Sequence, residues 1–317
     1  MPDATDLLLV KSGGASVFHE WIDGFAACCP GLTVKEWDDT SVRDDEVTYV
    51  LVGQSVHGWL ALMPKLKAIF SGAAGVDHLT RDPALPKHLP IVRMASHETA
   101  QTMGEYVCLA VLGLLRDWRR LALAQEQRRW DHFLGRRTAR DTRVGVLGLG
   151  HIGLTAARML GGLGFPVHGW SRSAKRIDGV TSYAGMAQLR ACLEASDIVV
   201  GLLPHTNETM RLIRAETIGW MPRGAGLVSA GRGSLVDLPD LLAALDSGRL
   251  GGAVLDVFEQ EPLPPDHPAW VHPRLTVTSH VAGFATRRVR AAYVAEAMAV
   301  LEQGGTPLYL YQHERGY

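Results

Sequence analysis

The chain has 317 residues, about twice the length of an ordinary domain, so its length alone predicts two domains. Lysine and arginine together number 32 against 33 aspartates and glutamates, and this near-neutral charge argues against nucleic acid or an anionic membrane as a partner. No apolar run reaches the length of a membrane-spanning helix, and the start of the chain is acidic where a signal peptide is basic, so a cytoplasmic location is expected. The four cysteines lack metal-ligand spacing, and no metal site is expected.

Short apolar runs at residues 7–10, 47–52 and 67–70 predict strands that are buried on both faces. The third run leads into a loop of small residues at 72–77. Because helix-like stretches lie between and after these runs, the beginning of the chain is predicted to form a small α/β unit.

Residues 98–123 contain no proline and carry apolar positions at helical spacing, so one long linking helix is predicted there. The following segment, 125–143, is polar and basic, with Trp130 and Phe133 among several arginines. These arginines are Arg128, Arg129, Arg136 and Arg137. In a chain of neutral net charge, a solvated arm explains them better than a nucleic-acid site, and exposed aromatics on such an arm suit a contact between two copies.

Six strand-like runs then follow, mostly separated by helical stretches, at residues 144–147, 167–170, 198–203, 226–229, 253–257 and 275–278. This number and rhythm are typical of a doubly wound dinucleotide-binding sheet. A further helix is predicted over 287–303.

The first of these runs leads directly into Gly148-Leu149-Gly150-His151-Ile152-Gly153, which a good helix sequence follows. In this pattern Gly148 permits a tight turn, Gly150 lets the backbone approach a pyrophosphate, and Gly153 lets the helix pack closely on the strand. The strand before the motif and the helix after it make dinucleotide binding the expected function of this turn.

The second of these runs ends at Ser171, where an NAD-selective site carries an acidic residue for the ribose hydroxyls. Here Ser171-Arg172-Ser173, with Lys175 and Arg176 close behind, offers hydroxyls and cations that suit the 2′-phosphate of NADP. We therefore expect NADPH to be preferred, with NAD as a possible coenzyme. The alternative is that the cluster is only a solvated surface and that selectivity is weak.

Three polar residues follow consecutive predicted strands, and the carboxyl ends of parallel strands are where doubly wound sheets place their chemistry. They are Arg232, Glu261 and His280. Reduction of a 2-oxo acid needs a cation for the carboxylate and carbonyl, a proton donor, and a carboxylate that orients this donor. Arg232 matches the cation, His280 the proton donor and Glu261 the carboxylate that orients it.

The chain resembles the D-isomer-specific 2-hydroxyacid dehydrogenases in six ordered motifs, at residues 72–77, 148–153, 203–209, 230–237, 256–262 and 280–283. The resemblance implies that Arg232, Glu261 and His280 are catalytic and that Ala74 and Gly75, with Arg232, bind the substrate. It also implies pyrophosphate contacts for His151 and Ile152 and places Asp256 near the nicotinamide carboxamide. Further coenzyme-binding positions implied are Leu203, Pro204, Thr209, Ala230, Gly231, Arg232, His280 and Gly283.

Residues 90–94, 103–107 and 125–130 are similar to the glyoxylate/hydroxypyruvate reductase A branch, whose members typically favour NADPH. This implies NAD(P)H-dependent reduction of a small 2-oxo acid, glyoxylate or hydroxypyruvate, to the D-2-hydroxy acid. Two positions depart from the broad family pattern: Ser229 stands where asparagine is usual, and Ser279 stands where proline commonly precedes the histidine.

The resemblance implies two doubly wound parallel-sheet domains, Rossmann-like and flavodoxin-like, with the coenzyme domain (98–284) inserted into a substrate domain made of 1–97 and 285–317. It also implies a homodimer formed through residues 106–133. One alternative is another D-2-hydroxyacid dehydrogenase activity, such as that of a phosphoglycerate dehydrogenase. The other is a non-catalytic NAD(P)-sensing protein. The joint presence of Arg232, Glu261 and His280 argues against it, because a sensor needs no general acid.

Overall fold

The computed structural model describes residues 6–133, 135, 137–314 and 316, so Arg136 of the basic arm lies outside the described residues. The chain forms two compact units, here called the first unit (Met1–Glu98 with Ala285–Tyr317) and the second unit (Thr99–Phe284). The second unit is thus an insertion within the first. Among the described helices, none combines the length and the apolarity that crossing a bilayer requires.

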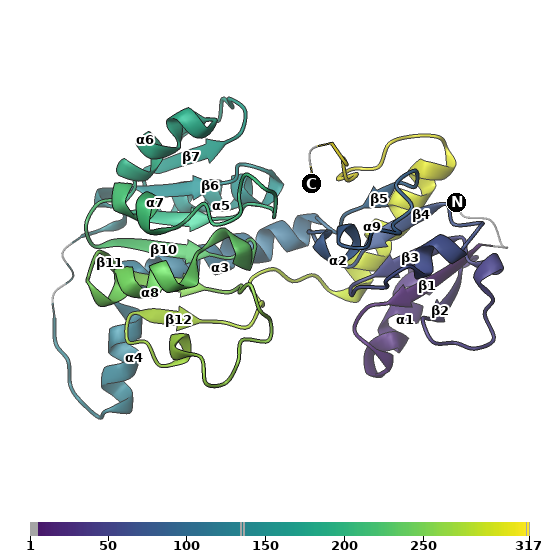
Figure 1. The fold of residues 1–317 in the computed structure, drawn as a ribbon, viewed down its shortest axis with the longest axis horizontal. Coiled ribbons are helices and arrows are strands. Elements are labelled where there is room, and N and C mark those ends of the chain that lie inside the picture. The colour runs from purple at the N-terminus through teal and green to yellow at the C-terminus, as the bar shows by residue number, and fades with distance from the viewer. Residues whose placement is uncertain (1–5, 134, 136, 315, 317) are drawn as a thin grey trace. The chain divides into compact units, whose positions relative to one another are not determined.

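The first unit is built on a five-stranded parallel sheet with the order β2-β1-β3-β4-β5 (Figure 1). This is the flavodoxin-like order of a doubly wound fold. Its strands are β1 (Leu7–Lys11), β2 (Thr33–Glu36), β3 (Tyr49–Val52), β4 (Ala68–Ser71) and β5 (Ile91–Val92). The central strands β3 and β4 are buried at every position, as expected for a sheet covered on both faces.

Helices from the two ends of the chain cover one face of this sheet. Trp21 and Phe25 of α1 (Phe18–Cys28) share a buried core with Val294 and Met298 of α9 (Arg287–Glu302). Helix α2 (Asp77–Thr80) contributes Leu79 to the core on the opposite face. The last helix of the chain therefore completes a core that the first helix begins.

The second unit contains a seven-stranded sheet of order β12-β11-β10-β9-β6-β7-β8, in which every pairing is parallel. Its strands are β6 (Val144–Leu147), β7 (Val167–Ser171), β8 (Val180–Ala184), β9 (Ile198–Gly201), β10 (Ala225–Ser229), β11 (Leu250–Leu255) and β12 (Leu275–Val277). The six predicted strands are present, and β8 is a seventh that the sequence analysis did not predict. The two sheets confirm the predicted fold class of two doubly wound α/β domains.

Helices cover both faces of the seven-stranded sheet. On one face, α3 (His97–Leu115) and α5 (His151–Gly162) pack against Ile198 and Val200 of β9. On the other face, the alternate residue Val199 faces α6 (Leu189–Glu194), α7 (Ala215–Trp220) and α8 (Leu238–Asp246). Short 3-10 helices lie at Ala15–Val17, Asp44–Glu46, Trp59–Leu62, Ala139–Asp141, Met186–Gln188, Gly233–Leu235 and Pro268–Trp270.

The prediction of one continuous helix over 98–123 is wrong. Helix α3 ends at Leu115, and a separate helix α4 (Trp118–Glu126) follows. The break falls at Asp117, whose backbone is left-handed with φ 50°. Aspartate tolerates this conformation better than most residues, so the chain turns here without the glycine or proline that would have marked a turn in the sequence.

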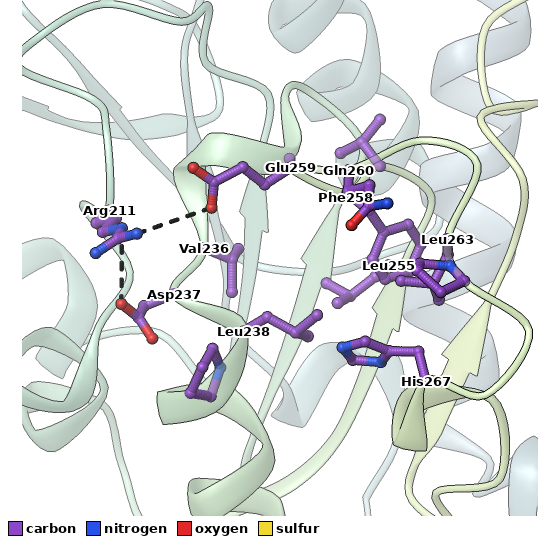
Figure 2. A pocket seen from close by; sticks show the side chains of 14 residues that line it. Arg211, Val236, Asp237, Leu238, Leu255, Phe258, Glu259, Gln260, Leu263 and His267 are labelled. Atoms are coloured by element: carbon purple, nitrogen blue, oxygen red, sulfur yellow. Dashed lines mark ion pairs between the residues drawn. The ribbon is translucent and has the colours of Figure 1, made fainter.

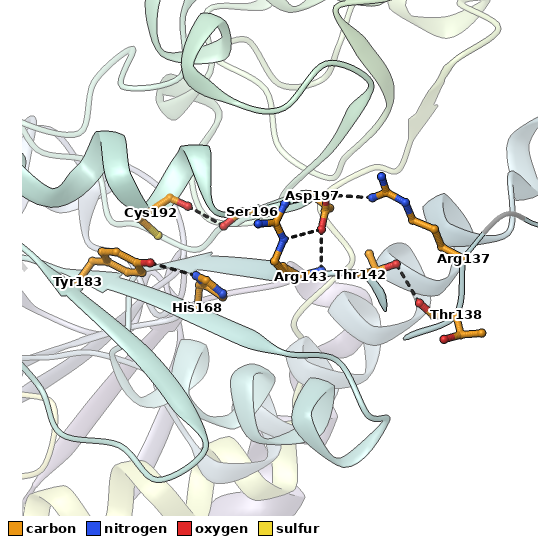
Figure 3. A network of polar contacts seen from close by, with 9 residues as sticks. All are labelled: Arg137, Thr138, Thr142, Arg143, His168, Tyr183, Cys192, Ser196 and Asp197. Atoms are coloured by element: carbon orange, nitrogen blue, oxygen red, sulfur yellow. Dashed lines mark hydrogen bonds and ion pairs between the residues drawn. The ribbon is translucent and has the colours of Figure 1, made fainter. Parts of the chain in front are cut away.

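A buried carboxylate joins the amino ends of β6 and β9, at the opposite edge of the sheet from the predicted site (Figure 3). Asp197 accepts hydrogen bonds from the backbone N–H and Nε of Arg143, both at 2.9 Å, and from Nη1 of Arg137 at 2.9 Å. Burial by itself raises the pKa of this carboxyl, but these hydrogen bonds outweigh it and lower the pKa to about 2. The charged form therefore fixes where the two central strands begin.

Candidate active site

The glycine turn joins β6 to α5 in a form that leaves the helix start open. Gly148 has φ +106°, and a Cβ on Gly153 would lie 1.8 Å from the Gly148 carbonyl oxygen. Gly150 is the N-cap residue of α5, has no side-chain cap, and a Cβ there would meet nothing within 4 Å. The first N–H groups of a helix, with open space before them, fit the pyrophosphate of a dinucleotide.

The end of β7 places hydroxyl and cationic side chains beside the glycine turn. Ser171 is buried, and its Oγ donates to the carbonyl oxygen of Ser173 at 2.9 Å. Lys175 Nζ donates to the carbonyl oxygen of Leu149, within the turn, at 2.5 Å. No carboxylate occurs between residues 171 and 176, so nothing in this stretch repels a phosphate on the ribose.

The loops that follow β9 and β10 touch one another at the carboxyl edge of the sheet. A Cβ on Gly231 would lie 2.7 Å from the carbonyl oxygen of Leu203, and the Ala230 N–H donates to Gly201. Thr209 Oγ1 donates to the carbonyl oxygen of Pro204 at 2.6 Å, which closes the 203–209 loop on itself. The coenzyme-binding positions predicted in these two segments therefore lie on loops that contact one another.

His280 and Glu261 are brought into direct contact. The imidazole Nδ1 lies 2.7 Å from Glu261 Oε2, and the other carboxylate oxygen, Oε1, accepts the N–H of Phe258 at 2.8 Å. Because a carboxylate can only accept, Nδ1 carries the hydrogen of this contact, which leaves Nε2 as the ring nitrogen available to a ligand. The His280 side chain is 53% exposed.

Arg232 lies between Gly231 and Gly233, and Gly233 forms a tight contact with a second loop. Its Nη1 donates to the Gly231 carbonyl oxygen at 2.8 Å. A Cβ on Gly233 would lie 1.9 Å from the carbonyl carbon of Phe258. The loop that carries Arg232 is therefore pressed against the loop that carries Glu261.

The backbone around His280 is held by one buried residue. Asp256, 1% exposed, accepts the N–H of His280 on its backbone carbonyl at 2.8 Å, and its two carboxylate oxygens accept the N–H groups of Val281 and Ala282, each at 2.9 Å. His280 itself is left-handed, with φ 57°. The predicted coenzyme-binding position Gly283 ends this loop, packed against Met103 of α3.

The predicted substrate loop lies in the first unit, directly after β4. Ser71, fully buried, donates its Oγ hydrogen towards the carbonyl oxygens of Ala73 and Gly75, at 2.9 and 2.8 Å, and accepts the Ala73 N–H at 3.2 Å. Ala74 and Gly75 were predicted from the resemblance, whereas Ser71, which shapes the loop, was not. A serine at the end of an apolar strand, just before small residues, was the available signal.

A pocket of about 300 Å³ lies beside the Arg232 and Glu261 loops (Figure 2). Its walls are mostly apolar, with Phe258 and Leu238 among them, and Arg211 at its edge lies 3.8 Å from Asp237 and 3.9 Å from Glu259. None of the predicted site residues lines it. Within the described residues, no group of three or more His, Cys, Asp or Glu side chains could hold a metal ion.

Comparison with known proteins shows the family of this chain. The model for the D-isomer specific 2-hydroxyacid dehydrogenase NAD binding domain matches residues 108–282. Glyoxylate/hydroxypyruvate reductase A of Yersinia enterocolitica is 35% identical over 305 residues, covering 94% of this chain and 96% of its own. The chain therefore belongs to the D-isomer specific 2-hydroxyacid dehydrogenase family, and the predicted resemblance, including its branch, is confirmed.

Two solved structures match nearly the whole chain. A D-isomer specific 2-hydroxyacid dehydrogenase from Xanthobacter autotrophicus, in complex with NADPH and MES, has a TM-score of 0.92 at 38% identity and covers 99% of both chains. An NADPH-dependent glyoxylate/hydroxypyruvate reductase from Sinorhizobium meliloti, in complex with NADP and sulfate, has a TM-score of 0.91 at 35% identity, covering 98% of this chain and 100% of its own.

Gly233→Ala tests the contact between the Arg232 and Glu261 loops. Because the added Cβ would overlap the backbone of Phe258, we expect the variant to lose about 2–3 kcal/mol of unfolding free energy and most of its activity. Urea unfolding and steady-state kinetics measure the two effects.

The matched control is Gly161→Ala in α5, where a Cβ meets nothing within 4 Å. The control should be at least as stable as the native chain, because alanine favours a helix. Native stability and activity in Gly233→Ala would contradict the contact.

Proposed function

We propose that this protein is an NADPH-dependent reductase that converts a small 2-oxo acid, glyoxylate or hydroxypyruvate, into the D-2-hydroxy acid. The observation that carries the proposal is the 2.7 Å contact between His280 and Glu261, beside the loop that carries Arg232. An imidazole whose second nitrogen is free for a ligand, oriented by a carboxylate, is the arrangement expected of a general acid. The named activities of the relatives support this choice of substrate.

In this proposal the chain's own residues bind the substrate and deliver the proton. Arg232 holds the substrate carboxylate and polarises its carbonyl oxygen, with the loop at Ala74 and Gly75 supplying backbone N–H groups. His280 holds a proton at Nε2 and passes it to the carbonyl oxygen as that oxygen gains negative charge. Glu261 fixes the orientation of the ring. A bound reduced nicotinamide supplies the hydride to the carbon.

The second unit is proposed as the coenzyme domain and the first unit as the substrate domain. The pyrophosphate would lie at the start of α5, against the N–H groups of His151, Ile152 and Gly153. Ser171, Arg172 and Ser173 would hold the 2′-phosphate of NADP. The remaining coenzyme contacts are proposed for Gly148, Gly150, Leu203, Pro204, Thr209, Ala230, Gly231, Arg232, Asp256, His280 and Gly283.

The native protein is tested by coenzyme oxidation against a panel of 2-oxo acids that includes 3-phosphohydroxypyruvate. We expect glyoxylate and hydroxypyruvate to give the highest kcat/KM, and NADPH to exceed NADH by at least about tenfold, because the cations after β7 match its extra phosphate. A preference for the phosphorylated acid would identify a phosphoglycerate-type enzyme instead. A preference for NADH would overturn the coenzyme assignment, and tight coenzyme binding without turnover would indicate a sensing protein.

His280→Ala and Arg232→Ala separate catalysis from coenzyme binding. We expect each to lower kcat/KM by roughly a hundredfold or more, because each removes a group that acts on the reacting oxygen. Fluorescence titration should show that NADPH still binds, because the contacts proposed for its pyrophosphate and 2′-phosphate are unchanged. His19→Ala, on the exposed surface of α1, is the control and should retain full activity. Near-native turnover in either site variant would refute its role.

Residues 106–133 are proposed to form the contact of a homodimer. Leu109, Trp118 and Trp130 are 70%, 67% and 94% exposed, a concentration of apolar surface that is unusual for a free face. Asp131 is also held against α4, since it accepts both Nε and Nη2 of Arg120 at 2.8 Å. Sedimentation should give twice the 34.4 kDa chain mass, and Trp118→Glu should halve it. A native monomer would exclude this assembly.

A further inference from the structure

We propose that Tyr106 and Thr278 are positioning residues for His280, acting through the carboxylate of Asp256. The inference rests on the proposed role of His280 as proton donor and adds two residues to which no part in the reaction has been assigned. Its basis is a chain of short hydrogen bonds that runs from α3 to the His280 loop.

The first step is that Asp256 determines the backbone conformation at His280. Three consecutive N–H groups, from His280 to Ala282, are accepted by this one residue at 2.8–2.9 Å. His280 is left-handed at φ 57°, a conformation that few residues other than glycine adopt and that the surrounding contacts hold here. The direction of the imidazole therefore depends on where the Asp256 carboxylate sits.

The second step is that Thr278 and Tyr106 fix this carboxylate from the other side. Thr278 Oγ1 donates to Asp256 Oδ1 at 2.6 Å, and Tyr106 Oη lies 2.6 Å from the same threonine oxygen. A threonine hydroxyl has one hydrogen, and here it is given to Asp256, so the tyrosine must be the donor to Thr278. The bonds therefore all point one way, from Tyr106 through Thr278 to Asp256.

The third step is that Tyr106 is a fixed anchor. Burial raises the pKa of its hydroxyl to about 12, with Thr278 opposing and Asp256 adding to the shift, so the donor hydrogen is present at any working pH. The same helix holds the loop at a second point, where Thr102 Oγ1 donates to the Phe284 carbonyl oxygen at 2.8 Å and accepts its N–H at 3.0 Å. Residues 102 and 106 lie one turn apart on one face of α3.

A proton donor is sensitive to such support because transfer requires a heavy-atom separation of about 2.6–3.2 Å. A displacement of about 1 Å can lower a rate a hundredfold while leaving ligand binding nearly unchanged. Loss of the Tyr106 or Thr278 hydroxyl should therefore act on kcat and on the proton-transfer step, with little change in the KM of the 2-oxo acid or the Kd of NADPH.

The test compares Thr278→Val, which keeps the shape and removes the hydroxyl, with Thr278→Ser, which keeps the hydroxyl. We expect Thr278→Val to lower kcat at least about tenfold and to raise the solvent deuterium isotope effect on kcat, and Thr278→Ser to restore both towards native values. In the protein without coenzyme, the amides of Val281 and Ala282 should exchange faster with solvent in Thr278→Val. Equal kcat, isotope effect and amide exchange in the two variants would overturn the proposal.

Tyr106→Phe should reproduce the Thr278→Val result. Its matched control is Tyr183→Phe, which removes another partly buried tyrosine hydroxyl of the same unit, bonded to His168 at 3.3 Å, and should leave kcat and the isotope effect native. If Tyr106→Phe and Tyr183→Phe give the same kcat and isotope effect, Tyr106 is not a positioning residue. Failure of the proposed function is recognised separately. If His280→Ala is active, His280 is not the proton donor. If His280→Ala is inactive but Tyr106→Phe has native kcat and isotope effect, only the role of the positioning residues is refuted.

Discussion

The second unit depends on places where one backbone segment lies directly against another and no side chain can intervene. Gly153 packs on the carbonyl of Gly148, which brings α5 against the end of β6, and Gly233 packs on Phe258, which brings the Arg232 and Glu261 loops together. A Cβ at either position would fall within 2 Å of a backbone atom. Glycine at these two positions therefore has a physical meaning, since the backbones at the edge that carries the proposed chemistry could not approach so closely with any larger residue.

At this edge, residues that are far apart in the sequence become one arrangement. His280 and Glu261 are 19 residues apart, and Tyr106 reaches Thr278 across 172. The parallel sheet explains this, because its carboxyl ends meet at one edge whatever the order of the strands. The polar residues at this edge differ in burial. The exposed imidazole of His280 is held by the partly exposed Glu261, and the backbone of His280 is held by the buried Asp256.

The sequence predicted the fold class and the family because their signals are local: apolar runs, a glycine turn between a strand and a helix, and ordered motifs. It missed β8, an edge strand whose Thr181 and Ser182 give no apolar run, and it missed the turn at Asp117. It named Asp256 from the resemblance but not the contacts of its carboxylate with Val281, Ala282 and Thr278. Those depend on tertiary packing between distant segments, which no spacing along the chain records. The catalytic and coenzyme roles remain predictions that the proposed variants address.

The shared core of α1 and α9 has a consequence for how the protein forms during synthesis. Trp21 and Phe25 are translated before the inserted unit, and Val294 and Met298, which complete their burial, are translated after it. Until α9 has been made, the first sheet keeps an uncovered apolar face, while the inserted unit can already fold, since its strands and helices are all made by residue 284. The order of folding is therefore inverted relative to the order of synthesis, and a chain cut short before α9 would expose the aromatic side chains of α1 to aggregation.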